Sequence, residues 1–62
     1  MTPLNYLRRE RMQQAVELLR DESLGIKEVA ILVGYRSESA FSNTFKQWSG
    51  LTPGLFRRDR QQ

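Results

Sequence analysis

The sequence GIKEVAILVGYRSESAFSNTFKQWS occupies residues 25–49 and contains two short segments with helical periodicity. Apolar residues recur at i, i+3, i+4 and i+7 in the first segment and at i, i+4 and i+7 in the second, a spacing that places them on one helix face. In order, they are Ile26, Val29, Ala30 and Val33, then Phe41, Phe45 and Trp48. We predict a first helix that ends at Gly34 and a second helix that ends at Gly50. The second helix would carry a buried aromatic stripe.

The junction between these two helices is typical of a helix-turn-helix. Ala30 supplies a small side chain where the helices would cross, and Gly34 can adopt the positive φ that a sharp turn needs. Tyr35 would fill the turn from the core side, and Ser37 is a favoured N-cap for the second helix. The second helix would then keep one side exposed.

One further helix is expected on each side of this unit. Thr2-Pro3 is a favourable helix start, and the apolar stripe that follows predicts a helix from Pro3 to about Arg20. The stripe consists of Leu4, Leu7, Met12, Ala15, Leu18 and Leu19. Thr52-Pro53 is the same Thr-Pro pair as Thr2-Pro3 at the first helix start, so it predicts a short helix over 52–58. A basic tail would follow at 59–62. We expect one all-α domain over residues 1–62, a small helical bundle of the homeodomain-like kind, because the loops between its helices are short.

The composition excludes several classes of protein. The 62 residues include 10 Lys+Arg, 7 Asp+Glu, no Cys and no His, which gives a net charge of +3. Without Cys or His there is no disulfide and no conventional zinc site, and most enzyme mechanisms lack their usual residues, so we predict no enzyme activity and no cofactor. No stretch is long and apolar enough to span a membrane, and no signal peptide is visible, so we predict a cytoplasmic protein. Basic residues at both ends flank an acidic segment at 21–34, a distribution that suits a phosphate-facing surface.

The positions described above, taken together, resemble the C-terminal signature of the AraC/XylS family of transcriptional regulators. The matching residues are Arg11-Met12, Ala15, Leu18-Leu19, Ile26, Glu28-Val29-Ala30, Gly34-Tyr35, Phe41, Phe45-Lys46, Gly50, Thr52-Pro53 and Phe56-Arg57. The family's DNA-binding unit has two helix-turn-helix subdomains joined by a long helix, and this chain resembles the connecting helix (1–20) plus the second subdomain. The resemblance implies double-stranded DNA as a partner. It also implies a missing N-terminal helix-turn-helix subdomain and an effector or dimerisation domain.

The resemblance makes the helix that begins near Glu38 the recognition helix, and the arc opposite its aromatic stripe is polar. The N-terminal part of such a helix meets base edges, so four residues are predicted to contact bases. They are Glu38, Ser39, Ser42 and Asn43. Six residues are predicted to contact phosphates and fix register. They are Arg36, Ser37, Lys46, Gln47, Arg57 and Arg58.

Some of these residues also have a structural interpretation. A Ser/Asn/Gln helix face is most often simply solvated, and Glu38 favours a helix start by its charge. Arg57 could cap a helix C-terminus, and Arg58 and Arg60 could form a loose basic tail. The alternative function is a small helical protein-interaction module with no direct DNA contact. Independently of this alternative, the exposed apolar residues Ile31 and Leu32 of the first short helix could mark a surface for the absent subdomain, a second copy or RNA polymerase.

Arg11 poses a separate question because it falls within the apolar arc of the first predicted helix. A charge that faces a core must be paired or must extend along the apolar surface to reach water. We therefore predict an ion pair between Arg11 and Glu28, which would link the first helix to the helix-turn-helix. The alternatives are that Arg11 contacts the missing subdomain or a phosphate.

Overall fold

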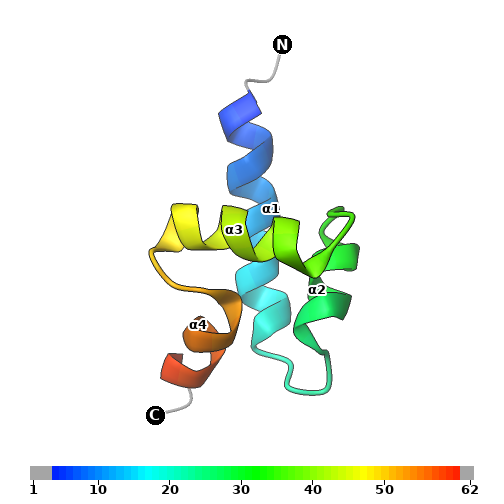
Figure 1. Cartoon of the computed structure of the whole chain (residues 1–62), viewed down its shortest axis with the longest axis vertical. Coiled ribbons are helices and arrows are strands. Elements are labelled where there is room, and N and C mark those ends of the chain that lie inside the picture. Colours follow the sequence, from blue (N-terminus) through cyan, green and yellow to red (C-terminus); the bar gives the residue numbers. More distant parts are fainter. Residues whose placement is uncertain (1–3, 61–62) are drawn as a thin grey trace.

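The computed structural model describes the backbone of residues 4–60 and the side chains of residues 7–59. This part of the chain forms four α-helices and no strand (Figure 1). They are α1 (Leu4–Leu19), α2 (Ile26–Leu32), α3 (Glu38–Ser49) and α4 (Pro53–Arg60). The predicted Thr2-Pro3 helix start, the packing of Leu4, the side chain of Arg60 and residues 61–62 lie outside what is described. The all-α prediction is confirmed, and α4 continues to Arg60 instead of ending at residue 58.

The helices are arranged around α1, the longest of them (Figure 1). In this view α3 crosses in front of α1, and α2 and α4 lie to either side of its C-terminal half. α2 packs against both α1 and α3, and α4 packs against α3. The first turns of α1 extend past α3, so only the second half of α1 is covered by the other helices.

The core lies where α1, α2 and α3 meet. Each of the three helices contributes apolar residues from a single face, as the 3.6-residue period requires. The buried residues are Met12, Ala15, Leu19, Val29, Ala30, Val33, Phe41 and Phe45. Aromatic rings extend this core toward α4, because the Phe45 and Phe56 rings meet edge to face with centroids 5.3 Å apart. Such pairs stabilise a small core beyond the area that they bury.

The turns that hold α3 in place have the local chemistry that the sequence predicts. Gly34 has φ +96° and Gly50 has φ +88°, a region that side chains other than glycine rarely adopt. Ser37 is the N-cap of α3, because its Oγ accepts a hydrogen bond from the backbone N–H of Ala40 at 3.1 Å. These predictions are confirmed, and they fix the direction in which α3 leaves the helix-turn-helix.

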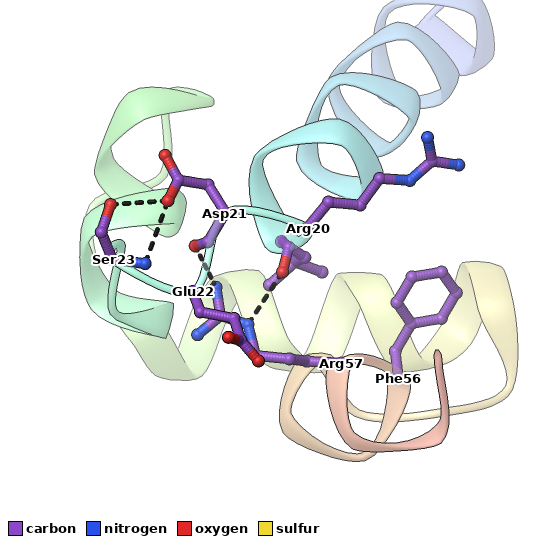
Figure 2. A pocket seen from close by; sticks show the side chains of 7 residues that line it. Arg20, Asp21, Glu22, Ser23, Phe56 and Arg57 are labelled. Carbon is purple, nitrogen blue, oxygen red and sulfur yellow. Dashed lines mark hydrogen bonds between the residues drawn. The ribbon is translucent and has the colours of Figure 1, made fainter. Parts of the chain in front are cut away.

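α4 is tied to the end of α1 by Arg57 (Figure 2). The Nε of Arg57 donates to the carbonyl of Leu19 at 2.9 Å, and its Nη2 donates to the carbonyl of Asp21 at 3.3 Å. A helix leaves its last carbonyls without intrahelical partners, and a cation there also complements the helix dipole. Arg57 therefore caps α1 from a helix that lies far along the chain.

Two apolar side chains that the periodicity predicts as buried are exposed. Trp48 is 40% exposed, so the predicted aromatic stripe is wrong at its last position. Leu7 is 47% exposed on the first turns of α1. Leu7 belongs to the first half of α1, which the other helices do not cover, and Trp48 lies near this half because it lines a hollow together with Arg8 and Arg9. The Phe45 ring meets both the Phe56 ring, with centroids 5.3 Å apart, and the Trp48 ring, with centroids 5.7 Å apart, so Trp48 belongs to the aromatic cluster although it is 40% exposed.

Candidate nucleic-acid interface

The outward face of α3 is a polar surface held on a rigid helix. Phe41 and Phe45 point into the core, and the opposite arc of the helix carries residues that are all exposed. They are Ser39, Asn43, Lys46 and Gln47. The N-terminus of this helix is open to solvent as well, since Glu38 is exposed. The core contacts and the Ser37 cap thus fix the helix while its outward face stays uncovered.

The four predicted base-contacting residues lie on or beside this face. Glu38, Ser39 and Asn43 are exposed, whereas Ser42 is half-buried at the flank of the helix. Among the described residues, none of the four side chains has a hydrogen-bond partner or an ion-pair partner. Their donors and acceptors are therefore available to a ligand. Contact of these residues with DNA bases remains a prediction.

The predicted phosphate-contacting residues divide into two groups. The first group is exposed and free of ion pairs within the described chain: Arg36, Lys46, Gln47 and Arg58. The second group has structural partners. Ser37 uses its oxygen to cap α3, although its hydroxyl hydrogen can still be donated. Arg57 is half-buried, and it donates to two carbonyls at the end of α1 (Figure 2). The structural interpretation of Arg57 thus has direct support.

The predicted ion pair between Arg11 and Glu28 is absent, so this prediction is wrong. Glu28 instead accepts a hydrogen bond from the backbone N–H of Gly25 at 3.2 Å, which completes a capping interaction at the start of α2. The guanidinium of Arg11 is exposed and lies 5.8 Å from the centroid of the Tyr35 ring. Arg11 therefore lies against the turn of the helix-turn-helix through a cation–π contact.

The sequence analysis assigns no site role to two arginines that lie near α3. Arg8 and Arg9, on the first turns of α1, line a shallow hollow together with Gln47 and Trp48 of α3. All four residues are exposed. A usable signal was present, because Arg8 precedes Met12 by four residues and so continues the core-facing stripe with a cation.

Neither a metal site nor a membrane-spanning element appears in the described residues. They contain no group of three or more carboxylates that could hold a metal ion, and the chain has no His or Cys. No helix among them combines the length and the apolar character that crossing a bilayer requires. What the described structure offers is a helix pair joined by a glycine turn, with an outward polar second helix. These features define a helix-turn-helix domain, a class that docks its second helix on DNA.

Comparison with known proteins agrees with this class. Residues 1–59 match the family described as "Helix-turn-helix domain", and the chain belongs to this family. It is 44% identical over 57 residues to the HTH-type transcriptional regulator AlkR of Acinetobacter baylyi, covering 92% of this chain and 19% of the relative. It is 39% identical over 61 residues to the HTH-type transcriptional activator RclR of Escherichia coli, covering 98% of this chain and 22% of the relative.

A solved structure supports the same assignment. The crystal structure of the transcriptional regulator CdpR from Pseudomonas aeruginosa matches with a TM-score of 0.87 and 36% identity, covering 94% of this chain and 18% of that one. The relatives are named as transcription regulators, including an AraC-like regulator of Streptomyces lividans, and not as enzymes. The AraC-family assignment is thus confirmed. The chain spans about a fifth of the length of the curated relatives it matches.

Proposed function

We propose that this chain binds double-stranded DNA in a sequence-dependent manner, as part of a transcription regulator, with α3 in the major groove. The proposal rests on the exposed polar face of α3, whose side chains form no hydrogen bond or ion pair within the described chain. The helix itself is fixed by its cap and its two core phenylalanines. An α-helix is about 10–12 Å across and the major groove about 12 Å wide, so the helix fits the groove.

Base recognition in this proposal comes from the N-terminal half of α3. Asn43 is exposed, and its amide can donate one hydrogen bond to adenine and accept another from it. We therefore expect Asn43 to be the most specific of the base-contacting residues. Ser39 and Ser42 suit several bases through their hydroxyls, and Glu38 can accept from the amino group of cytosine. The half-burial of Ser42 limits its reach compared with Ser39.

Phosphate contacts in this proposal come from the exposed residues around α3. Lys46, Gln47 and Arg36 lie on the helix or just before it, and Ser37 can donate its hydroxyl at the helix start. Arg58 is exposed on α4 and supplies a further charge. Arg57 is assigned to the cap of α1, since its guanidinium already donates to two backbone carbonyls. These contacts fix register and orientation without reading sequence.

The test compares Asn43→Ala with Lys46→Ala. A library of duplexes is selected on the unmodified 62-residue chain, and the affinity for the selected site and for single-base variants is measured by fluorescence anisotropy. We expect Asn43→Ala to lose about 1–3 kcal/mol of discrimination at one base position. Lys46→Ala should weaken binding to all sequences alike and reduce the salt slope by about 1.

The outcomes separate the proposal from its alternative. If Asn43→Ala shows the same base preference as the unmodified chain at every position, Asn43 does not contribute to base recognition. If the unmodified chain shows no salt-dependent binding to any duplex, phosphate neutralisation is absent and the proposal fails. A helical protein-interaction module would then be the better description, with Ile31 and Leu32 as its exposed apolar residues.

A further inference from the structure

We propose that the hollow between α1 and α3 is a phosphate-binding site, in which Arg8 and Arg9 hold one DNA backbone beside the recognition helix. The site is lined by Arg8, Arg9, Gln47 and Trp48. This inference rests on the proposed function, because it assigns the partner of the hollow as the DNA in which α3 lies. It adds residues of α1 to an interface otherwise formed by the helix-turn-helix and the last helix.

The charge of the lining sets this hollow apart from its neighbours. A hollow between the end of α1 and α4 is lined by Asp21 and Glu22 as well as by arginines. A second hollow, along α1, includes Glu10 and Glu17. The hollow of Arg8 and Arg9 contains no carboxylate, so its positive charge is not neutralised locally. An anion is the ligand that such a surface attracts.

The side chains of the lining are hydrogen-bond donors of three kinds. Each guanidinium presents a planar fork that matches phosphate oxygens. The amide of Gln47 and the indole N–H of Trp48 add neutral donors. No hydrogen bond or ion pair within the described chain engages these four side chains. The partial exposure of Trp48, which the core does not explain, thus has a use in this site.

Three other arginines of the described chain have structural partners, whereas Arg36 and Arg58 have none, like the two arginines on α1. Arg20 forms an ion pair with Glu17 at 3.6 Å, Arg57 donates to two carbonyls, and Arg11 lies over the Tyr35 ring. Arg8 and Arg9 have no such partner in the described residues.

The position of the hollow fits a DNA backbone because it adjoins the outward face of α3. Gln47 belongs both to this face and to the lining of the hollow, so the two surfaces are continuous. A helix that fills the major groove has a phosphate backbone along each flank, since the groove is about as wide as the helix. The first turns of α1 extend past α3 (Figure 1), and in this proposal they lie along one of these flanks.

The test is the salt dependence of duplex binding by the double variant Arg8→Gln/Arg9→Gln. The variant should reduce the slope of log affinity against log salt by about 1 to 2, since each phosphate contact contributes about 0.9. Near 0.1 M salt, this change corresponds to a loss of about ten-fold or more in affinity for every sequence. Trp48 is the single tryptophan of the chain, so its emission on duplex binding provides a second readout at the site itself.

Two control variants make the result specific. Arg20→Gln removes one positive charge, half of what the double variant removes, from the other end of α1, and it should leave the slope unchanged because Arg20 is paired with Glu17. Arg8→Lys/Arg9→Lys keeps both charges and should retain the slope. Thermal unfolding of each variant shows whether the fold is kept, which we expect for residues this exposed.

The inference fails if the double glutamine variant keeps the slope of the unmodified chain, or if Arg20→Gln lowers the slope as much. In both cases the unmodified chain would still bind DNA, and the proposed function would stand. If the unmodified chain does not bind duplex DNA with salt dependence, the proposed function and this inference fail together.

Discussion

The two halves of α1 belong to one helix but lie in different surroundings. In the C-terminal half, Met12, Ala15 and Leu19 are buried, and Arg57 caps the last carbonyls. In the N-terminal half, every described side chain from residue 7 to residue 11 is exposed. Helical periodicity runs through both halves, so it shows which face of a helix is apolar but not how far a partner covers it. The covered half supports the fold, and the uncovered half carries the arginines of the proposed phosphate site.

The largest expected effect is the difference in stability between a substitution in the covered half of α1 and one in the uncovered half. Met12→Ala should destabilise the domain by about 2–5 kcal/mol, because it leaves a cavity in the core. A domain of this size has only a few kcal/mol of stability in total, so this variant should be largely unfolded at room temperature. Leu7→Ala should cost less than about 1 kcal/mol, since Leu7 is already half exposed. Urea unfolding followed by circular dichroism measures both, and equal losses would contradict the comparison.

A medium effect is expected at the cap of the covered half. Arg57→Gln removes both donors and leaves the Leu19 carbonyl unsatisfied, which should cost about 1–2 kcal/mol. Arg58→Gln is the matched control, because Arg58 is exposed and has no partner in the described chain. Hydrogen exchange should also become faster in the last turn of α1 in the Arg57 variant alone. Identical stability of the two variants would show that the cap contributes nothing.

The smallest effect concerns pH at the same end of α1. Hydrogen bonds from the Ser23 hydroxyl and backbone N–H hold the pKa of Asp21 below its ordinary value, and the Arg57 charge lowers it further. Because the folded pKa lies below the unfolded one, the carboxylate stabilises the fold at neutral pH. This stabilisation begins to be lost when the pH falls below the pKa of Asp in the unfolded chain, about 4. It is lost completely once the pH has fallen through the lower pKa of Asp21 in the folded state.

An NMR titration of the Asp21 carboxyl group measures this effect. The apparent pKa should lie below the ordinary value of Asp and should rise toward it in Arg57→Gln. In Asp21→Asn, the free energy of unfolding should fall slightly less steeply as the pH is lowered into the acid range. An apparent pKa at or above the ordinary value would contradict the geometry.

The local features of the fold could be predicted from the sequence because neighbouring residues determine them. The Ser37 cap, the positive φ of Gly34 and the glycine that ends α3 each depend on the chemistry of a few consecutive residues. The buried positions of α2 and the two core phenylalanines follow from periodicity. The polar outward arc of α3 was predicted in the same way, and the exposure of Ser39 and Asn43 agrees with it.

The features that could not be predicted depend on the relative placement of the helices. Periodicity assigns Trp48 to the buried stripe, but its ring contacts Phe45 from the edge of the core and is 40% exposed. The predicted ion pair between Arg11 and Glu28 assumes that a position on the apolar helix face is buried, whereas Arg11 is exposed and Glu28 caps α2. The contact of Arg57 with Leu19 joins residues 38 positions apart, and no local pattern records such a contact.

The bond between Arg57 and Leu19 also has a consequence for folding kinetics. Most of this fold consists of contacts within helices or between consecutive helices, an organisation that favours fast folding. The arginine, by contrast, can reach its carbonyl only after the intervening chain has folded back on α1, so we expect this bond to form after the rate-limiting step. Loss of the bond should then accelerate unfolding while leaving the folding rate nearly unchanged. The cap would thus determine how long the folded domain persists rather than how fast it forms.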